Sequence, residues 1–360
     1  MRLCVGVVIG TRPEVIKLIP VIDRLHDAGW SRVVLLPSGQ HGHLLRQALA
    51  QYGLDQLEVP PPPTTNHPAE LVDILAERLR TSMAHCRPDI VLVQGDTATA
   101  LAGARIAAEL GIPVAHVEAG LRTYDLDQPF PEESNRQAIS RLASLHFAPT
   151  AGAAANLIRE SIPAASVFVT GNTIVDALAR TVPDSSVEPA DRPIAVVTLH
   201  RRELAPHVER VVSGLQDVLE DHDELHMVIP VHPNPAISAT LRSAFGTHDR
   251  VDIVAPLPHA RFVSLLRKAA VVITDSGGVQ EEAAILGVPL VVARRVTERP
   301  EVLEGSRAIM AGYDSYSIRM AVNRALRMSP NRDRNELLGD GHAAVHIERC
   351  LQTFCSIHCR

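Results

Sequence analysis

Short apolar runs alternate with longer amphipathic stretches along most of the chain. The runs are rich in Val, Ile and Leu, and they cover residues 3–9, 33–36, 90–93, 114–117, 167–169, 194–199, 226–230, 271–274 and 290–292. Apolar positions at helical spacing mark the stretches between most of them, for example residues 13–28, 98–110, 208–220 and 279–286. Uninterrupted apolar runs are typical of parallel strands covered on both faces. The alternation therefore predicts an α/β, doubly wound fold.

A polar, proline-rich segment at residues 181–193 breaks this rhythm. About six βα units precede it and about five follow, which predicts two Rossmann-like domains, over residues 1–182 and 192–340. We expect residues 341–360 to form a helix or tail that packs back on the N-terminal domain. Because ligands of open α/β sheets bind beyond the carboxyl ends of the strands, we also expect a ligand-binding cleft between the two domains.

Composition narrows the class of protein. The 360 residues are 46% hydrophobic, which is enough for two packed domains and excludes a disordered chain. Acidic residues outnumber basic ones by 41 to 35, and this net charge of −6 argues against a nucleic-acid partner. No apolar run approaches the roughly 20 residues of a membrane span, and residues 3–9 are too short for an export signal. We expect a cytoplasmic protein with reduced cysteines and no membrane partner.

Carboxylates follow the predicted strands of the first half. Asp96, Glu118 and Glu132 each come after one of these strands. Taken singly, each has a structural explanation, because Asp96 could cap a helix, Glu118 could pair with Arg122, and Glu132 could pair with Arg136 four residues on. Three carboxylates at one sheet edge would nevertheless repel one another without a chemical task. Together they favour acid–base chemistry.

Two helix starts are suited to bind phosphate. Arg12 and Lys17 lie at the first, where the positive end of the helix dipole favours an anion. The second begins with Ser276, Gly277 and Gly278, directly after the predicted strand at residues 271–274. Paired glycines allow the backbone to approach a ligand closely. Glu282, about one turn further on, is placed to accept hydrogen bonds from a ribose.

Nine segments carry a resemblance to a known family. In chain order they read GTRPE, GDT, HVEAGLRT, PFPEESNR, TGNTIVDAL, TLHRRE, HPNP, DSGGVQEEA and TERPE. This series, from Gly10 to Glu301, resembles the non-hydrolysing UDP-N-acetylglucosamine 2-epimerase family. The resemblance implies the two-domain GT-B arrangement, a homodimer and no redox cofactor. It also implies interconversion of UDP-GlcNAc and UDP-ManNAc, by elimination of UDP to a 2-acetamidoglucal and its re-addition.

The family's functional residues map onto this sequence one by one. The catalytic set that the resemblance implies is Asp96, Glu118, Glu132 and His200. The substrate-binding and UDP-binding set is Arg12, Lys17, Arg136, His232, Ser276, Gly277, Gly278, Glu282 and Arg299. The C-terminal cysteines, Cys350, Cys355 and Cys359, lack the paired spacing of zinc ligands, so we expect no metal.

Other functions share parts of this pattern. A hydrolysing 2-epimerase would release the free sugar, and an epimerase of a related UDP-2-acetamido sugar would use the same groups. A GT-B glycosyltransferase would need the phosphate site but not the three acids, and a regulatory protein would bind the nucleotide sugar without turnover. The chain departs from the family pattern at Leu204, and only Gln40 and His41 persist where many members hold a second UDP-GlcNAc molecule.

Overall fold

The computed structural model describes residues 2–65, 67–181, 191–231, 235–304, 307–329 and 336–358. The chain divides into two units. Unit 1 comprises residues 1–177 and 339–360, and unit 2 comprises residues 178–338. The segment expected to link two domains, residues 181–193, lies largely outside the described residues.

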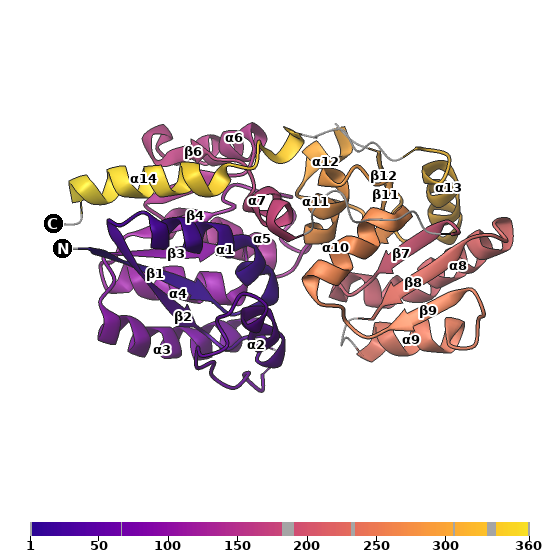
Figure 1. Cartoon of the computed structure of the whole chain (residues 1–360), viewed down its shortest axis with the longest axis horizontal. Helices are drawn as coiled ribbons and strands as arrows, with labels where there is room; N and C mark the ends of the chain where they lie inside the picture. The colour runs from indigo at the N-terminus through magenta and orange to yellow at the C-terminus, as the bar shows by residue number, and fades with distance from the viewer. Residues whose placement is uncertain are drawn as a thin grey trace. The chain divides into compact units, whose positions relative to one another are not determined.

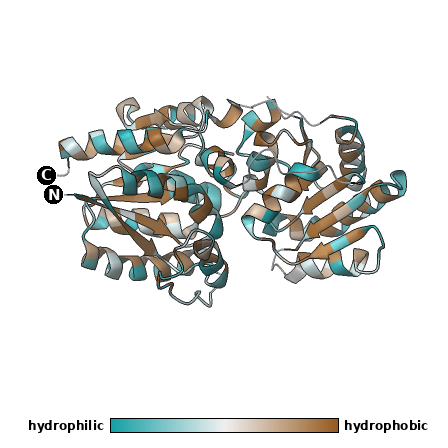
Figure 2. Cartoon of the chain, viewed as in Figure 1, coloured by the Kyte–Doolittle hydropathy of each residue, from teal (hydrophilic) through white to brown (hydrophobic). Residues whose placement is uncertain are grey.

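Unit 1 contains a six-stranded sheet in the order β2-β1-β3-β4-β5-β6, in which every neighbouring pair is parallel. Its strands are β1 Leu3–Ile9, β2 Ser31–Pro37, β3 Ile90–Gln94, β4 Val114–Val117, β5 Leu145–Ala148 and β6 Val167–Val169. β3 and β4 are buried along their whole length, because helices cover both faces of the sheet. Figure 2 shows these inner strands as predominantly hydrophobic.

The helices of unit 1 come from both ends of the chain. They are α1 Arg12–Asp27, α2 His43–Ala50, α3 Pro68–Cys86, α4 Ala98–Glu109, α5 Glu132–Leu142, α6 Ala151–Arg159 and α14 Ala343–His358. Helix α7, Thr173–Thr181, begins in unit 1 and ends in unit 2, because the division falls after residue 177. The C-terminal helix α14 packs along α1 (Figure 1). Its residues Ile347 and Leu351 enter the same core cluster as Leu18 of α1, and Nε1 of Trp30 donates a hydrogen bond to Glu348 at 2.6 Å.

Unit 2 has a second parallel sheet, in the order β12-β11-β10-β7-β8-β9. Its strands are β7 Ile194–Thr198, β8 His226–Pro230, β9 Val251–Val254, β10 Ala269–Thr274, β11 Leu290–Val292 and β12 Ala308–Met310. Its helices are α8 Val208–Asp221, α9 Pro235–Phe245, α10 His259–Lys268, α11 Gly277–Ile285, α12 Pro300–Glu304 and α13 Ser315–Ala325. The prediction of two Rossmann-like α/β domains is confirmed.

Three strands were not predicted: β5, β9 and β12. Each has three or four residues. β5 contains a buried histidine, His146, whose ring nitrogens lie 2.9 and 3.4 Å from the carbonyl oxygens of Ser140 and Ser166. β9 carries an exposed Asp252 in its middle. The polar positions of β5 and β9 hide these two short strands from an apolar pattern, and β12 has only three residues. Unit 2 has six strands where about five units were expected.

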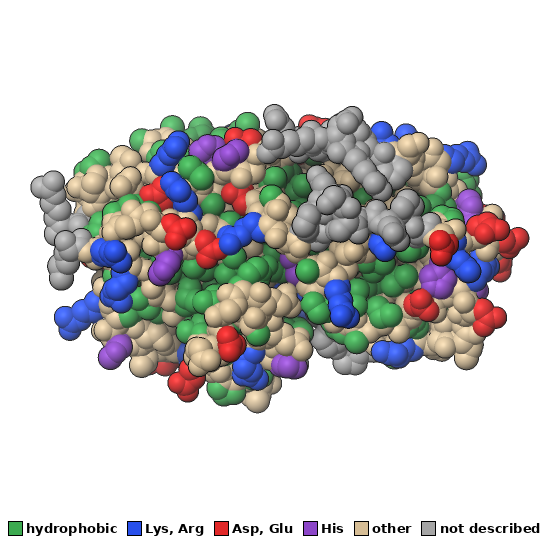
Figure 3. Space-filling model, in the orientation of Figure 1, with side chains coloured by type: hydrophobic (Ala, Val, Ile, Leu, Met, Phe, Trp, Pro, Cys, Tyr) green, Lys and Arg blue, Asp and Glu red, His purple; other side chains and the backbone are tan. Residues whose placement is uncertain are grey.

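Charged side chains of both signs are scattered over the visible face of the molecule (Figure 3). Among the described helices, none is both long enough and apolar enough to span a bilayer.

Candidate functional site

In unit 1, the loops after β1, β3 and β4 meet at one edge, because these strands are neighbours in a parallel sheet. Glu14 connects two of the loops. Its Oε2 accepts the backbone N–H groups of Gly10 and Thr11 at 2.7 Å, and its Oε1 accepts the hydroxyl of Thr97 at 2.5 Å. Burial raises the pKa of Glu14 to about 7. The loop that follows Asp96 is thereby tied to the start of α1.

Glu118, the first residue after β4, forms a buried ion pair with Lys17 of α1. Its Oε2 also accepts a hydrogen bond from Nε2 of Gln94 at 3.0 Å. The alternative pairing of Glu118 with Arg122 is wrong. The guanidinium of Arg122 instead donates to both carboxylate oxygens of Glu160, which follows α6, at 2.7 and 2.8 Å.

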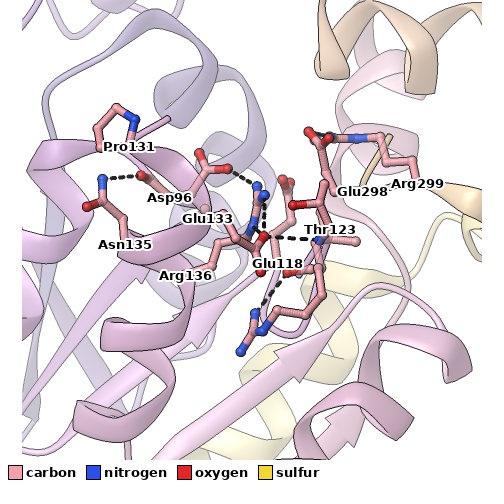
Figure 4. A network of polar contacts seen from close by, with 12 residues as sticks. Asp96, Glu118, Thr123, Pro131, Glu133, Asn135, Arg136, Glu298 and Arg299 are labelled. Atoms are coloured by element: carbon pink, nitrogen blue, oxygen red, sulfur yellow. Dashed lines mark hydrogen bonds and ion pairs between the residues drawn. The ribbon is translucent and has the colours of Figure 1, made fainter. Parts of the chain in front are cut away.

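Asp96 and Glu133 lie on either side of the Arg136 guanidinium (Figure 4). Nη1 of Arg136 lies 2.5 Å from Oδ2 of Asp96, and Nη2 lies 2.8 Å from Oε2 of Glu133. Asn135 donates a further hydrogen bond to the backbone oxygen of Asp96 at 2.8 Å. Because Arg136 is only 1% exposed, the pair it makes with Asp96 is not a surface ion pair. Helix α5 therefore fixes the position of Asp96.

Glu133 holds both Arg136 and the backbone at residues 123 and 124 in place. Its carboxylate accepts the backbone N–H groups of Thr123 and Tyr124, at 3.0 and 3.2 Å, as well as binding Arg136. Burial opposes its ionisation, but Arg136 and these donors outweigh burial and hold the pKa of Glu133 below its usual value. Its neighbour Glu132, which the sequence predicted as catalytic, is half-buried at the first position of α5.

A buried histidine, His116, is hydrogen-bonded to the loop that carries Asp96. Nε2 of His116 lies 2.8 Å from the carbonyl oxygen of Gly95, so this nitrogen carries the proton and donates. Burial is the main reason that the pKa of His116 falls to about 3, which keeps the ring neutral. Gly95 has φ +69°, a conformation that glycine adopts without strain. His116 and Gly95 together fix the backbone conformation of the residue before Asp96.

In unit 2, the loops after β7 and β10 are joined by one carboxylate. Asp275 is fully buried, and it accepts the backbone N–H groups of His200 and Arg201 at 2.9 and 2.8 Å. Its Oδ1 lies 3.2 Å from Nδ1 of His200. Burial lowers the pKa of His200, against the opposing effect of Asp275. The imidazole is therefore held in one orientation.

Arginines gather around Glu298 at the same end of the sheet of unit 2. Glu298 binds Arg294 at 2.8 Å, forms an ion pair with Arg299, and lies 3.7 Å from Arg201. Arg299 also binds Glu281 at 2.6 Å (its pairing with Glu298 is seen in Figure 4). Three guanidinium groups and the carboxylates of Glu281 and Glu298 therefore lie together beside α11.

The predicted phosphate cradle begins α11. Ser276 occupies the N-cap position, and its backbone N–H donates to Oγ1 of Thr274 at 3.0 Å. A Cβ atom added to Gly277 would collide with the guanidinium of Arg299, whereas Gly278 faces open space. Glu282 is buried, and its Oε1 accepts a hydrogen bond from His259 at 2.7 Å.

The structure thus groups the predicted residues into two clusters, each within its own unit. Unit 1 brings together Lys17, Asp96, Glu118 and Arg136, with Arg12 half-buried at the first position of α1. Unit 2 brings together His200, Ser276, Gly277, Gly278 and Arg299 near Asp275. His232 lies outside the described residues. No cluster of His, Cys, Asp and Glu suited to a metal ion occurs among the residues that the structure describes.

Two Rossmann-like units, one with an acid cluster and one with an arginine cluster at its strand ends, define a two-domain α/β enzyme. The chain belongs to the UDP-N-acetylglucosamine 2-epimerase family, whose model matches residues 23–352. The UDP-N-acetylglucosamine 2-epimerase of Yersinia pestis is 37% identical over 370 residues, covering 96% of this chain and 97% of that protein.

Solved structures agree with this assignment. The structure of S. aureus MnaA with UDP has a TM-score of 0.91 and 32% identity, and the match covers 99% of this chain and 97% of that one. The UDP-GlcNAc 2-epimerase of Neisseria meningitidis, bound to UDP-GlcNAc, has a TM-score of 0.88 and 30% identity, covering 98% and 100% of the two chains.

Proposed function

We propose that this protein is a non-hydrolysing epimerase that interconverts UDP-GlcNAc and UDP-ManNAc. The observation that carries the proposal is the pairing of two strand-end acids with fixed partners, Glu118 with Lys17 and Asp96 with Arg136. A relative of the same family has been solved with UDP-GlcNAc bound, and another with UDP. We further propose that the protein works as a homodimer in the cytoplasm.

The chemistry begins from a C–H bond that is not acidic. The hydrogen at C2 of the sugar has no adjacent carbonyl, so its removal requires that a leaving group departs at the same time. A carboxylate accepts the C2 proton while the C1–O bond breaks, and the electron pair of the C–H bond becomes the C1–C2 double bond of a 2-acetamidoglucal. UDP leaves with the electrons of the C1–O bond. Such proton transfer by a positioned side chain is general base catalysis.

The reverse half-reaction inverts the configuration. An acid delivers a proton to the opposite face of C2, and UDP adds back at C1. One proton is removed and one is returned, so two carboxyl groups in opposite protonation states are needed. We assign this task to two of the three acids Asp96, Glu118 and Glu132. Lys17 compensates the negative charge of Glu118, to which Gln94 also donates a hydrogen bond, and Arg136 compensates that of Asp96.

The diphosphate requires a cationic site that holds it after the C1–O bond has broken. We assign this role to the start of α11 with Arg299, supported by the arginine cluster around Glu298. Backbone N–H groups at a helix start and arginine side chains both favour phosphate oxygens. His200 is assigned to the oxygen that leaves C1. The Asp275 carboxylate, 3.2 Å from Nδ1, favours the protonated ring, whose Nε2–H can donate to that oxygen. Fixed charges of this kind stabilise the developing anion.

Incubation of the protein with UDP-GlcNAc in D2O, followed by NMR, tests this function. The proposal predicts deuterium at C2 of both epimers with the UDP linkage intact. Release of free ManNAc and UDP would instead identify a hydrolysing enzyme. Substrate that stays unchanged until an acceptor is added would identify a glycosyltransferase, and no reaction with any UDP-2-acetamido sugar would identify a binding protein.

A further inference from the structure

Among the described residues, the buried carboxylate of Glu282 has His259 as its side-chain partner. Its Oε1 accepts the Nε2–H of His259 at 2.7 Å, and both side chains are buried, with exposures of 6% and 2%. Within the part of the chain that the structure describes, no Lys or Arg forms an ion pair with Glu282. The adjacent Glu281 differs, because Arg299 binds it at 2.6 Å. Two neighbouring glutamates of α11 are therefore held by opposite means.

The geometry of the contact shows which nitrogen of His259 donates. Nδ1 of His259 is buried and has no hydrogen-bond partner among the described residues. A carboxylate oxygen can only accept, so Nε2 carries the proton that is directed at Oε1 of Glu282. This single donor occupies one carboxylate oxygen, whereas an arginine would occupy both oxygens.

The backbone that carries this contact is rigid. His259 is the first residue of α10, and Glu282 lies in the middle of α11. Phe262 and Leu266 of α10 pack with Ala283 of α11 in one buried cluster. The His259–Glu282 contact is thus fixed by the core and not by a mobile loop.

We propose that His259 is a positioning residue that gives the site its selectivity for the ribose hydroxyls of the nucleotide. The inference rests on the proposed function, in which Glu282 accepts hydrogen bonds from the ribose. The hydroxyls donate to the charged carboxylate, while His259 holds it at the correct angle through Oε1. A nucleotide without these hydroxyls leaves a buried, charged carboxylate short of donors, and it binds more weakly for that reason.

Calorimetric titration with UDP and with 2′,3′-dideoxy-UDP tests the proposal. We expect the parent protein to prefer UDP by about tenfold or more, the size of effect typical of a hydrogen bond to a charged group. H259F removes the donor but keeps a ring, and it should weaken UDP binding about tenfold while leaving dideoxy-UDP binding unchanged. H259Q keeps an N–H donor and should restore most of the preference. R261A removes an exposed side chain of the same helix and is the matched control. It should change neither the affinity for UDP nor that for dideoxy-UDP.

The outcomes separate the two hypotheses. Equal loss of both ligands in H259F, or an unaltered preference for UDP, would overturn the role of His259, provided that the variant keeps the melting temperature of the parent. If H259F does not fold, H259L removes the same donor and gives the same test. A parent protein that binds UDP no better than inorganic diphosphate would instead overturn the proposed function itself.

Discussion

Asp275 accepts both backbone N–H groups of the His200–Arg201 pair and also lies 3.2 Å from Nδ1 of His200. One carboxylate therefore fixes the position of a loop and the orientation of the imidazole that this loop carries. A carboxylate beside Nδ1 favours a protonated imidazole, whose Nε2–H then points away from that carboxylate. The proposed action of His200 at the leaving oxygen requires this orientation.

Replacement of Asp275 by Asn should lower kcat by about 100-fold, because the amide lacks the negative charge that favours the protonated form of His200. Steady-state kinetics of D275N, H200A and the double variant would check this. If Asp275 acts through His200, the double variant should be no slower than H200A alone. Additive losses in the double variant would show that Asp275 has a separate role. UDP affinity is the control and should change little.

Removal of Lys17 should destabilise unit 1, because it leaves the buried carboxylate of Glu118 without its cation. We expect K17M to lower the free energy of unfolding by about 3 kcal/mol, and K17M/E118Q to recover part of that loss. The single tryptophan, Trp30, lies in unit 1 and makes its fluorescence a reporter of this unit. R105M is the control, since the ion pairs of Arg105 are exposed and should contribute less than about 1 kcal/mol. Equal effects of K17M and R105M would contradict the buried pair.

The stability of unit 1 should fall in mild acid because of His116. Its pKa of about 3 in the folded state lies below the ordinary value of 6.5, so the unfolded chain binds the proton more readily. The contribution of neutral His116 to the free energy of unfolding is fully present above pH 6.5, and it is lost progressively as the pH falls towards 3. Between pH 7.5 and 5 the parent should lose about 2 kcal/mol more than H116Q, which does not titrate. Urea unfolding followed by Trp30 fluorescence measures this difference, and identical pH profiles would contradict the assignment.

Adjacent glutamates of α5 should respond oppositely to substitution. E132Q removes a proposed catalytic acid and should lower kcat by about 100-fold or more with little change in melting temperature. E133Q removes the partner of Arg136 and of the Thr123 and Tyr124 N–H groups, so it should lower stability by about 2–3 kcal/mol. Kinetics and thermal unfolding of both variants check the distinction. Stability loss in E132Q without an effect on kcat would reverse the two roles.

Much of this fold could be predicted from the sequence, because strands of a parallel sheet are apolar throughout and their loops begin where polarity returns. Residues 114–117, 167–169, 226–230 and 290–292 were predicted with the limits that the structure has. The strand Leu145–Ala148 was missed, because the burial of its histidine depends on backbone partners outside the strand, six and 20 residues away.

The supporting residues of the site were harder to predict than the acids themselves. Asp275 directly precedes the predicted Ser276–Gly278 segment, and an acid at the end of a buried strand is a usable signal that it has a partner. Glu133 was hidden beside Glu132, since the sequence does not tell which of two adjacent glutamates faces inwards. His259 gave no signal at all, because its contact with Glu282 spans 23 residues and depends on how α10 and α11 pack. Contacts of this kind are set by tertiary packing and not by local pattern.

The cleavage of the C1–O bond is the step on which the whole account depends, and positional isotope exchange measures it directly. UDP-GlcNAc labelled with 18O in the bridge between C1 and the β-phosphorus is incubated with the protein and followed by 31P NMR. If UDP departs and re-adds, the 18O redistributes into the non-bridging positions of the β-phosphate, at a rate comparable with epimerisation. If the label stays in the bridge while the sugar epimerises, UDP never leaves and the elimination mechanism is wrong.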